Sequence, residues 1–517
     1  MHFYLHKIEL YLIITKRIRS IRKKILNGIL FWFLINFIKG EELTLRILLI
    51  KPSYSNVYRW GPQTDIITPP LGLEYIAAYI KDIADVRIID NRLETVNLKV
   101  IEKAIEQFRP DYVGISWNYS SQIDITRRIA SIAKTHGCRT VVGGWHPTLV
   151  PSETLELHSI DIIVRGEGEI SFRELIKNNS PIGIPGLSYK QDGKQVHNPN
   201  RELMNLKHIR PPARHFRSVA AKKTYNFFGI PVDCIETSRG CPYSCNFCSI
   251  HHFFRGKYRQ HAIRDIIKEL QSIKIRNRAR LIYIIDDNFV VDHKFVMELS
   301  NAIIKSRINK YFMTQVRVDM IVNHPEVFEK MADAGFIYLF LGLESFSDAT
   351  LEKLNKQLKF KQIKSALKIL HNLGFIVHGN IILGANLEDT KQDIESTIEI
   401  AKNLDVDLLT YSLLTPFPGT KLWEQVLSEG LLLTRDWHKF NWSNPVIKYP
   451  HLSSDDLSYY LTKAYKETMS FSRPWQGIRR LVQTRGLKFN MIRIGPIGVF
   501  MVIFQMMKNL RKILSHK

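Results

Sequence analysis

Three cysteines, Cys241, Cys245 and Cys248, stand close together in the segment 239–248, which reads Arg-Gly-Cys-Pro-Tyr-Ser-Cys-Asn-Phe-Cys. From one tight loop, this spacing can turn three thiolates toward one point. Three thiolates can bind three irons of a cubane cluster, which leaves the fourth iron without a protein ligand. Because iron–sulfur clusters usually take four cysteines, an open iron indicates that another molecule binds there. A fourth cysteine would favour a closed zinc site, but none follows residue 248.

The two remaining cysteines indicate the compartment. Cys138 and Cys234 lie in apolar, strand-like stretches, which favours small buried side chains over a disulfide. This cysteine usage is typical of a reducing compartment, which an exposed cluster also requires. We therefore expect a cytoplasmic protein. Its 517 residues, with 45% hydrophobic and 24% charged side chains, predict two or three ordered domains.

Positive charge is concentrated at the two ends of the chain. The net charge is +24; residues 1–40 carry eight Lys or Arg and one Glu, and residues 468–517 carry ten Lys or Arg and no acidic residue. These charges alternate with the apolar stretches 25–38 and 494–507, which favours a membrane surface over a nucleic acid. Each stretch has fourteen residues, fewer than the roughly 20 that span a bilayer.

We therefore expect both ends to lie in a membrane interface, as a peripheral attachment to the inner face of the membrane. Ordinary helices packed in the core are the alternative. A cleaved signal peptide is not expected, because no small-residue cleavage site follows residue 38.

Between residues 45 and 176 the sequence alternates short apolar strands with helices. Candidate strands are 45–51, 86–90, 112–116, 139–143 and 161–164, and candidate helices are 73–81, 98–107, 123–135 and 152–157. Buried β-branched strands connected by helices predict an α/β fold with a parallel, doubly wound sheet. Sheets of this kind bind ligands at the carboxyl ends of their strands.

A second alternating series follows a polar connection. Its six candidate strands are 232–237, 281–285, 311–316, 337–342, 375–383 and 408–413. Six strand–helix units predict a partial (βα)6 barrel rather than the full eight, and the cysteines follow its first strand, at the end where barrel active sites form. We therefore divide the chain into a basic amphipathic membrane segment (1–42), a Rossmann-like domain (43–185), a linker (186–225), the barrel (226–435) and a basic helical C-terminal region (436–517).

The cysteine triad, the six-unit barrel and the preceding doubly wound domain together resemble the cobalamin-dependent radical S-adenosylmethionine (SAM) enzymes, over roughly residues 45–430. The resemblance implies a [4Fe-4S] cluster, SAM and cobalamin as cofactors. In that family the amine and carboxylate of SAM chelate the open iron, and reductive cleavage yields a 5′-deoxyadenosyl radical that abstracts hydrogen from an unactivated carbon. The protein supplies orientation and shielding.

The resemblance also assigns residues around the barrel. Phe247 is expected beside the adenine of SAM. The second strand ends in Asp286 and Asp287, and because buried acids are costly without partners, we expect them to serve the site or to cap the next helix. Gln315 and Arg317 end the third strand and are expected to contact the cofactors.

Two further strand ends bear on the same resemblance. Glu344, in Gly-Leu-Glu-Ser, resembles the family carboxylate that contacts the ribose or amine of SAM. After the fifth strand, residues 385–387 read Ala-Asn-Leu where the family usually has Pro-Gly-Glu, so that loop's contacts are not assigned. The segment 415–420 resembles the family's proline-rich turn after the sixth strand.

In the first domain the resemblance implies a cobalamin cradle. Glycine is needed where backbone approaches a large flat ligand, and glycine-rich segments end two of the predicted strands. The residues expected near the corrin or its dimethylbenzimidazole tail are Ser116, Gly143, Gly144, His146, Gly166 and Glu167. The family's cobalt ligand, a histidine in Asp-x-His-x-x-Gly, falls on Arg92, and arginine stays protonated and cannot coordinate cobalt.

These features predict an enzyme that methylates an unactivated carbon of a hydrophobic substrate, such as a lipid, isoprenoid or tetrapyrrole, with an external electron donor such as flavodoxin or ferredoxin. An oxidative cyclase that uses the same cofactors is the alternative. A methylthiotransferase acting on transfer RNA would need a second cysteine triad, and Cys138 stands alone. A non-enzymatic alternative is a membrane-tethered redox or cobalamin-sensing protein, which would not cleave SAM.

Overall fold

The computed structural model describes residues 44–53, 66–92, 98–217, 225–227, 230–276, 279–469 and 472–485. From Arg46 onward the described residues belong to one compact unit. The expected membrane segments, residues 1–42 and 494–507, lie outside the described residues. Within the described ranges, the structure contains no helix that is both long enough and apolar enough to cross a membrane.

The first sheet is built on short apolar strands whose side chains are buried. Leu48 of β1 (Leu45–Lys51) lies opposite Val113 of β4 (Tyr112–Ser116), and Ile115 lies opposite Val142 of β5 (Arg139–Gly143). These strands and β6 (Ile162–Val164) run parallel, and β3 (Ala84–Asp90) completes the order β3-β1-β4-β5-β6. This doubly wound order has its switch point between β1 and β4. It confirms the predicted fold class.

Helices connect these strands and cover the sheet. They are α3 (Leu71–Ile80), α4 (Leu98–Phe108), α5 (Ile123–Thr135), α6 (Trp145–Leu149), α7 (Pro151–Glu156) and α8 (Gly168–Asn178). Ile101, Ile105 and Ile129 pack on Leu48 and Val142 in one cluster of buried side chains.

The sheet extends further along the chain than the predicted domain boundary. Residues 187–197, which we expected to belong to a linker, form the antiparallel hairpin β7 (Leu187–Gln191) and β8 (Lys194–His197) at the edge of this sheet. Because β7 pairs with β6, the main-chain polar groups of both strands are satisfied. The connection between the two sheets therefore starts after the hairpin.

The second sheet is a half-barrel, as predicted. Six parallel strands form it, in the order β17-β16-β15-β14-β13-β10. They are β10 (Ile230–Ile235), β13 (Leu281–Ile284), β14 (Tyr311–Val316), β15 (Phe336–Glu344), β16 (Ile376–Leu383) and β17 (Leu408–Leu413). Two short antiparallel strands, β9 (Asn226–Phe227) and β2 (Ile66–Ile67), extend the sheet beyond β10.

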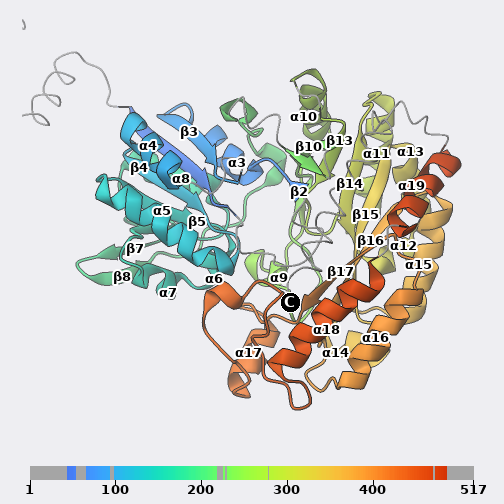
Figure 1. The fold of residues 1–517 in the computed structure, drawn as a ribbon. Helices are drawn as coiled ribbons and strands as arrows, with labels where there is room; N and C mark the ends of the chain where they lie inside the picture. The colour runs from blue at the N-terminus through green and yellow to red at the C-terminus, as the bar shows by residue number, and fades with distance from the viewer. Residues whose placement is uncertain are drawn as a thin grey trace, which may run out of the picture. The chain divides into compact units, whose positions relative to one another are not determined.

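Helices cover the outer face of the half-barrel (Figure 1). They are α10 (Ile263–Arg276), α11 (His293–Lys305), α12 (Val318–Asn323), α13 (Pro325–Asp333), α14 (Asp348–Lys353), α15 (Phe360–Asn372) and α16 (Lys391–Asn403). The main core lies between these helices and the strands, with Phe312, Phe336 and Phe375 fully buried.

The C-terminal region closes the fold around the last strands. It contains α17 (Lys421–Ser428), α18 (Ser454–Thr468) and α19 (Ser472–Arg485). The Tyr465 hydroxyl of α18 bonds to both the N–H and the carbonyl oxygen of Tyr411 in β17, each at 3.0 Å. Arg485 of α19 donates to the carbonyl oxygens of Leu373 and Phe336, which tie this helix to the barrel.

Candidate active site

The three cysteines lie in a loop that follows β10 and the short strand β11 (Ser238–Arg239). Gly240 begins the loop with φ 88°, and a side chain there would overlap the carbonyl oxygen of Lys257. All three cysteines are partly exposed and line one cavity of about 390 Å³. Among the described residues no three Asp, Glu, His or Cys side chains gather closely enough to hold a single metal ion. Thiols at the edge of a shared cavity fit a larger cluster, in which each thiolate binds a different iron.

Only one of the two expected acids faces this cavity. Asp287 lines it and accepts a hydrogen bond from the Gly240 N–H at 3.0 Å. Asp286 instead points into the protein, where it accepts bonds from the Thr237 N–H and the Ser238 hydroxyl at 2.7 and 2.6 Å. The expectation that Asp286 contacts a cofactor is therefore corrected: its carboxylate holds the segment that leads into the cysteine loop.

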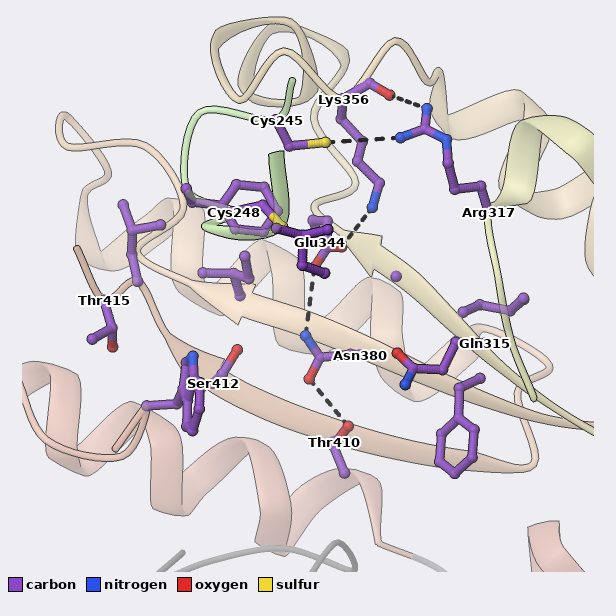
Figure 2. A pocket seen from close by; sticks show the side chains of 18 of the residues that line it. Cys245, Cys248, Gln315, Arg317, Glu344, Lys356, Asn380, Thr410, Ser412 and Thr415 are labelled. Carbon is purple, nitrogen blue, oxygen red and sulfur yellow. Dashed lines mark hydrogen bonds and ion pairs between the residues drawn. The ribbon is translucent and has the colours of Figure 1, made fainter. Parts of the chain in front are cut away.

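Arg317 connects the cysteine loop to the barrel wall. Its guanidinium stacks 3.7 Å from the centre of the Tyr243 ring, and Nη1 lies 3.8 Å from the sulfur of Cys245. Nη2 donates to the carbonyl oxygen of Lys356 at 2.7 Å, and Nε pairs with Asp319 at 2.9 Å. Figure 2 shows this side chain reaching toward Cys245 from above the strands. These contacts fix the Arg317 guanidinium beside the cysteine loop.

A line of polar side chains crosses the cavity below Arg317. Lys356 pairs with Glu344 at 2.6 Å, Asn380 donates to the same carboxylate at 3.4 Å, and Thr410 donates to Asn380 at 3.2 Å (Figure 2). Glu344 has φ 61°, at a register shift between Gly342 and Glu344 where β15 meets β16. Left-handed backbone is costly for a glutamate and is concentrated at functional sites. Glu344 lines the cavity, and its contact with SAM stays a prediction.

The other barrel residues predicted for the site also line the cavity. Gln315 is exposed to it and donates to the Tyr283 hydroxyl at 2.8 Å. Phe247 lines it between Cys245 and Cys248 and packs against an apolar cluster at its rim.

Lys356, Asn380 and Trp442 also line the cavity, and sequence reasoning missed all three. Trp442 has φ 60° and is held because its carbonyl oxygen accepts the Leu413 N–H at 2.7 Å. Its ring lies 5.2 Å from that of Phe417 and 5.8 Å from that of Tyr119, which belongs to the first domain. No local pattern marks a lysine or tryptophan that a loop brings to the cavity from a distance. Asn380, inside a predicted strand, could have been found by asking which side chains face the barrel interior.

A second cavity, of about 260 Å³, lies at the carboxyl ends of the strands in the first sheet. Five of the six residues that we expected near cobalamin line it: Ser116, Gly143, Gly144, Gly166 and Glu167. Gly144 has φ 115°, and a Cβ there would lie 2.5 Å from Oδ1 of Asn118 and 2.6 Å from the carbonyl oxygen of Trp117. At Gly166, which also has positive φ, a Cβ would meet nothing within 4 Å. Open backbone of this kind suits a large ligand that covers the strand ends.

His146 does not line this cavity, contrary to expectation. Its ring stacks on Trp117 at 4.2 Å, contacts Trp437 edge-on at 5.1 Å, and lies 3.0 Å through Nδ1 from the Ser120 hydroxyl. Only 3% of the residue is exposed, and burial lowers the pKa of His146 to about 3. His146 is therefore a neutral core residue that joins the first domain to the C-terminal region.

Arg92, which stands where the cobalt-binding histidine was sought, is also committed elsewhere. Its guanidinium pairs with Asp90 through two bonds, at 2.8 and 2.5 Å, and donates to the carbonyl oxygen of Thr68. The side chain is 5% exposed and does not line the cavity. The residues present thus fit cobalamin as a backbone cradle, with no ligand for cobalt at position 92.

A barrel with an open three-cysteine loop and a doubly wound domain with a second cavity define a radical SAM enzyme that carries a B12-binding domain. A family model described as the radical SAM superfamily matches residues 235–421, and one described as the B12 binding domain matches residues 64–176. The chain belongs to the cobalamin-dependent radical SAM enzymes. It therefore uses a [4Fe-4S] cluster, SAM and cobalamin.

Individual relatives support this assignment. An uncharacterized methyltransferase of Pyrococcus horikoshii is 34% identical over 427 residues, which cover 81% of this chain and 91% of the relative. A hopanoid C-3 methylase of Methylococcus capsulatus is 29% identical over 393 residues, which cover 73% and 72%. The structure of the cobalamin-dependent SAM radical enzyme OxsB, with aqua-cobalamin and SAM bound, has a TM-score of 0.68 at 19% identity and covers 86% of this chain and 71% of its own.

Proposed function

We propose that this enzyme methylates an unactivated carbon of a hydrophobic small molecule. The observation that carries the proposal is the pair of cavities in one compact unit, one with the open cysteine triad and one with the glycine cradle. When bound, the cluster and cobalamin supply reductive cleavage of SAM and a transferable methyl group. The relatives named as methylases favour methyl transfer over other uses of these cofactors.

The chain's own residues would hold and shield the reactants. We assign SAM binding to Phe247, Gln315, Arg317 and Glu344, and cobalamin binding to Ser116, Gly143, Gly144, Gly166 and Glu167. Asn380 and Lys356 hold the Glu344 carboxylate in one orientation, so it can accept hydrogen bonds from SAM without reorganising.

The composition of the first cavity supports an apolar substrate. Ile250, Phe340, Leu414 and Trp442 line it together with the polar residues. Apolar walls exclude water from a reactive site and bury apolar substrate surface. The relative named for hopanoid methylation acts on a molecule of that class. Delivery of such a molecule from a membrane surface, with an external flavodoxin or ferredoxin as electron donor, completes the proposal.

Lipid and tetrapyrrole profiling of a deletion strain by mass spectrometry tests the proposal. Loss of a species that is heavier than its precursor by one CH₂ group supports methylation. Loss of a species lighter by two hydrogens would support an oxidative cyclase instead, and unchanged lipids and tetrapyrroles would contradict a hydrophobic substrate. With purified, reconstituted protein, absence of 5′-deoxyadenosine after reduction with SAM would indicate a sensor rather than an enzyme.

A further inference from the structure

A short ribbon lies between the cobalamin cavity and the cysteine loop. It consists of β11 and β12 (Arg259–Gln260), which run antiparallel with Arg239 opposite Arg259. Arg239 lines the cobalamin cavity and precedes Cys241 by two residues. Arg239 thus lines the second cavity and directly adjoins the loop that carries the cysteines.

The Arg239 guanidinium joins three carboxylates from both domains. It bonds to Glu167 at 2.9 Å and to Glu169 at 2.7 Å in the first domain, and to Glu236 at 2.7 Å after β10. The residue is 8% exposed, so these pairs are shielded from water. A planar guanidinium can bond to several carboxylates at fixed angles, whereas an ammonium cannot reproduce that geometry.

Arg259 holds one of the same carboxylates from the other strand of the ribbon. Its Nη1 lies 2.9 and 3.0 Å from the two oxygens of Glu167 and donates to the Met204 carbonyl oxygen at 2.8 Å. Glu167 also accepts the Met204 N–H at 2.7 Å. Both arginines therefore bind Glu167 and so fix the loop of Gly166 to Gly168, which forms part of the cavity wall.

Hydrogen bonds and close packing fix the ribbon relative to the cysteine loop. Thr237 and Ser238 bond to Asp286, and Gly240 bonds to Asp287. No side chain fits at Gly240, because the backbone there packs directly on Lys257. A shift of Arg239 would thus be passed to Cys241 through one tightly held residue.

We infer that Arg239 is a positioning residue that couples the occupancy of the cobalamin cavity to the geometry of the cluster loop. Cobalamin in its cavity would cover Glu167 and fix the loop that Arg239 grips. Coupling between two sites is reciprocal, so SAM at the cluster must change the affinity for cobalamin by the same factor. The inference rests on the cofactors of the assigned family.

Arg217 provides a matched control. It is also a buried arginine between the domains, and it bonds to Glu74 of α3 at 2.8 Å and to Asp233 of β10 at 2.9 Å. Its exposure is 6%. Unlike Arg239, it lines neither cavity and is not on the cysteine loop. If both arginines only hold the domains together, substitution of either should have the same effect. If Arg239 couples the two sites, only its substitution should abolish the coupling.

The test uses the full chain with a reconstituted cluster and hydroxocobalamin. The dissociation constant of hydroxocobalamin is measured by absorbance with and without SAM, and the reduced cluster is recorded by electron paramagnetic resonance with and without hydroxocobalamin. In the unsubstituted protein we expect SAM to change the cobalamin affinity by about 5- to 150-fold, and cobalamin to shift the cluster signal.

Arg239→Lys and Arg239→Ala should nearly abolish both the effect of SAM on cobalamin affinity and the effect of cobalamin on the cluster signal. Arg217→Lys should retain both effects, although it should lower the melting temperature at least as much as Arg239→Lys. Unchanged responses in the Arg239→Lys protein, or equal losses in the Arg217→Lys protein, would overturn the inference. If the unsubstituted protein took up no hydroxocobalamin, the assignment of the second cavity would fail instead. If it bound without coupling, only the positioning role would fail.

Discussion

The walls of the two cavities of the enzyme differ in kind: side chains dominate one, and backbone contributes strongly to the other. In the barrel cavity, side chains project into the space: three thiols, the guanidinium of Arg317 and the Lys356–Glu344 pair. In the cobalamin cavity, glycine backbone forms part of the wall, and the charged residue Arg239 pairs with both Glu167 and Glu169.

This difference separates two kinds of specificity. Side chains that point into the barrel cavity determine which groups can be bound and polarised there, so their loss removes chemistry. We expect the second cavity to recognise its ligand by shape, because backbone and paired charges in its wall leave room rather than reactive groups. Substitutions in the first cavity should therefore remove SAM binding or cleavage, whereas substitutions in the second should change how well cobalamin fits.

Removing a cluster ligand should have the largest effect. We expect Cys248→Ala to lower the iron content and to reduce 5′-deoxyadenosine formation below detection, because a cubane cluster with only two thiolates is poorly held. The protein should still bind hydroxocobalamin, since its cavity contains no cysteine. Iron analysis, product chromatography and a cobalamin titration measure the three quantities. Complete loss of cobalamin binding would show that the two cavities do not differ as described.

Breaking the buried pair in the barrel cavity should have the next largest effect. Glu344 and Lys356 are each 8% exposed, and their atoms lie 2.6 Å apart. Glu344→Gln should lower the free energy of unfolding by about 3–5 kcal/mol, because it leaves an uncompensated buried ammonium. It should also weaken SAM binding, measured by equilibrium dialysis.

A double-mutant cycle is the control for this pair. Glu344→Gln combined with Lys356→Met should cost less than the sum of the single substitutions in urea unfolding, because the two side chains interact directly. Strict additivity would mean that the pair is not formed in solution.

The sequence predicted the fold and the barrel cavity well for a local reason. Each strand is a short apolar run, and the end of a parallel strand fixes which residues reach the cavity, as for Gln315, Arg317 and Glu344. The same reasoning failed for Asp286. Asp286 and Asp287 follow the end of β13, and the sequence does not say which of two adjacent acids faces the cavity.

The cobalamin cavity was predicted less completely, because its wall depends on long-range pairing. Gly143 and Gly144 were found from their glycine pattern, but the neighbouring His146 turns into the aromatic core toward Trp437, which is far along the chain. Arg239 was not recognised because its three carboxylate partners come from two domains. Residues 187–197 were assigned to a linker since polar hairpins at a sheet edge carry little apolar pattern.

The pH dependence of stability tests the core position of His146. The folded protein holds this histidine neutral, with a pKa of about 3, whereas an unfolded histidine titrates near pH 6.5. Below pH 6.5 the unfolded state therefore binds a proton that the folded state excludes, and stability falls on acidification, by up to about 3 kcal/mol at pH 4. His146→Gln should remove this part of the dependence in urea unfolding followed from pH 7 to pH 4.

The buried His378, with its pKa also lowered to about 3 by burial, should keep its own contribution in the His146→Gln protein. The absorption spectrum of bound hydroxocobalamin should not change on this substitution, because His146 lies outside the cobalamin cavity. A changed spectrum would place His146 beside the corrin after all, as expected from the sequence.

Filling the cobalamin cavity from Gly72 should have the smallest effect on stability and a selective effect on binding. Gly72 lies in α3 and lines the cavity, and a Cβ there meets nothing within 4 Å. Gly72→Ala should therefore raise the free energy of unfolding by roughly 0.4–1 kcal/mol, through the lower entropy of the unfolded chain.

Gly72→Phe should fold but bind hydroxocobalamin more weakly, because its ring occupies the cavity, while SAM binding at the cluster is preserved in the absence of cobalamin. Gly144→Ala is the contrasting control, since φ of 115° and the contact with Asn118 should cost about 1–3 kcal/mol. If Gly72→Phe bound hydroxocobalamin normally, the cofactor would not enter the cavity at Gly72, and shape could not be the basis of recognition there.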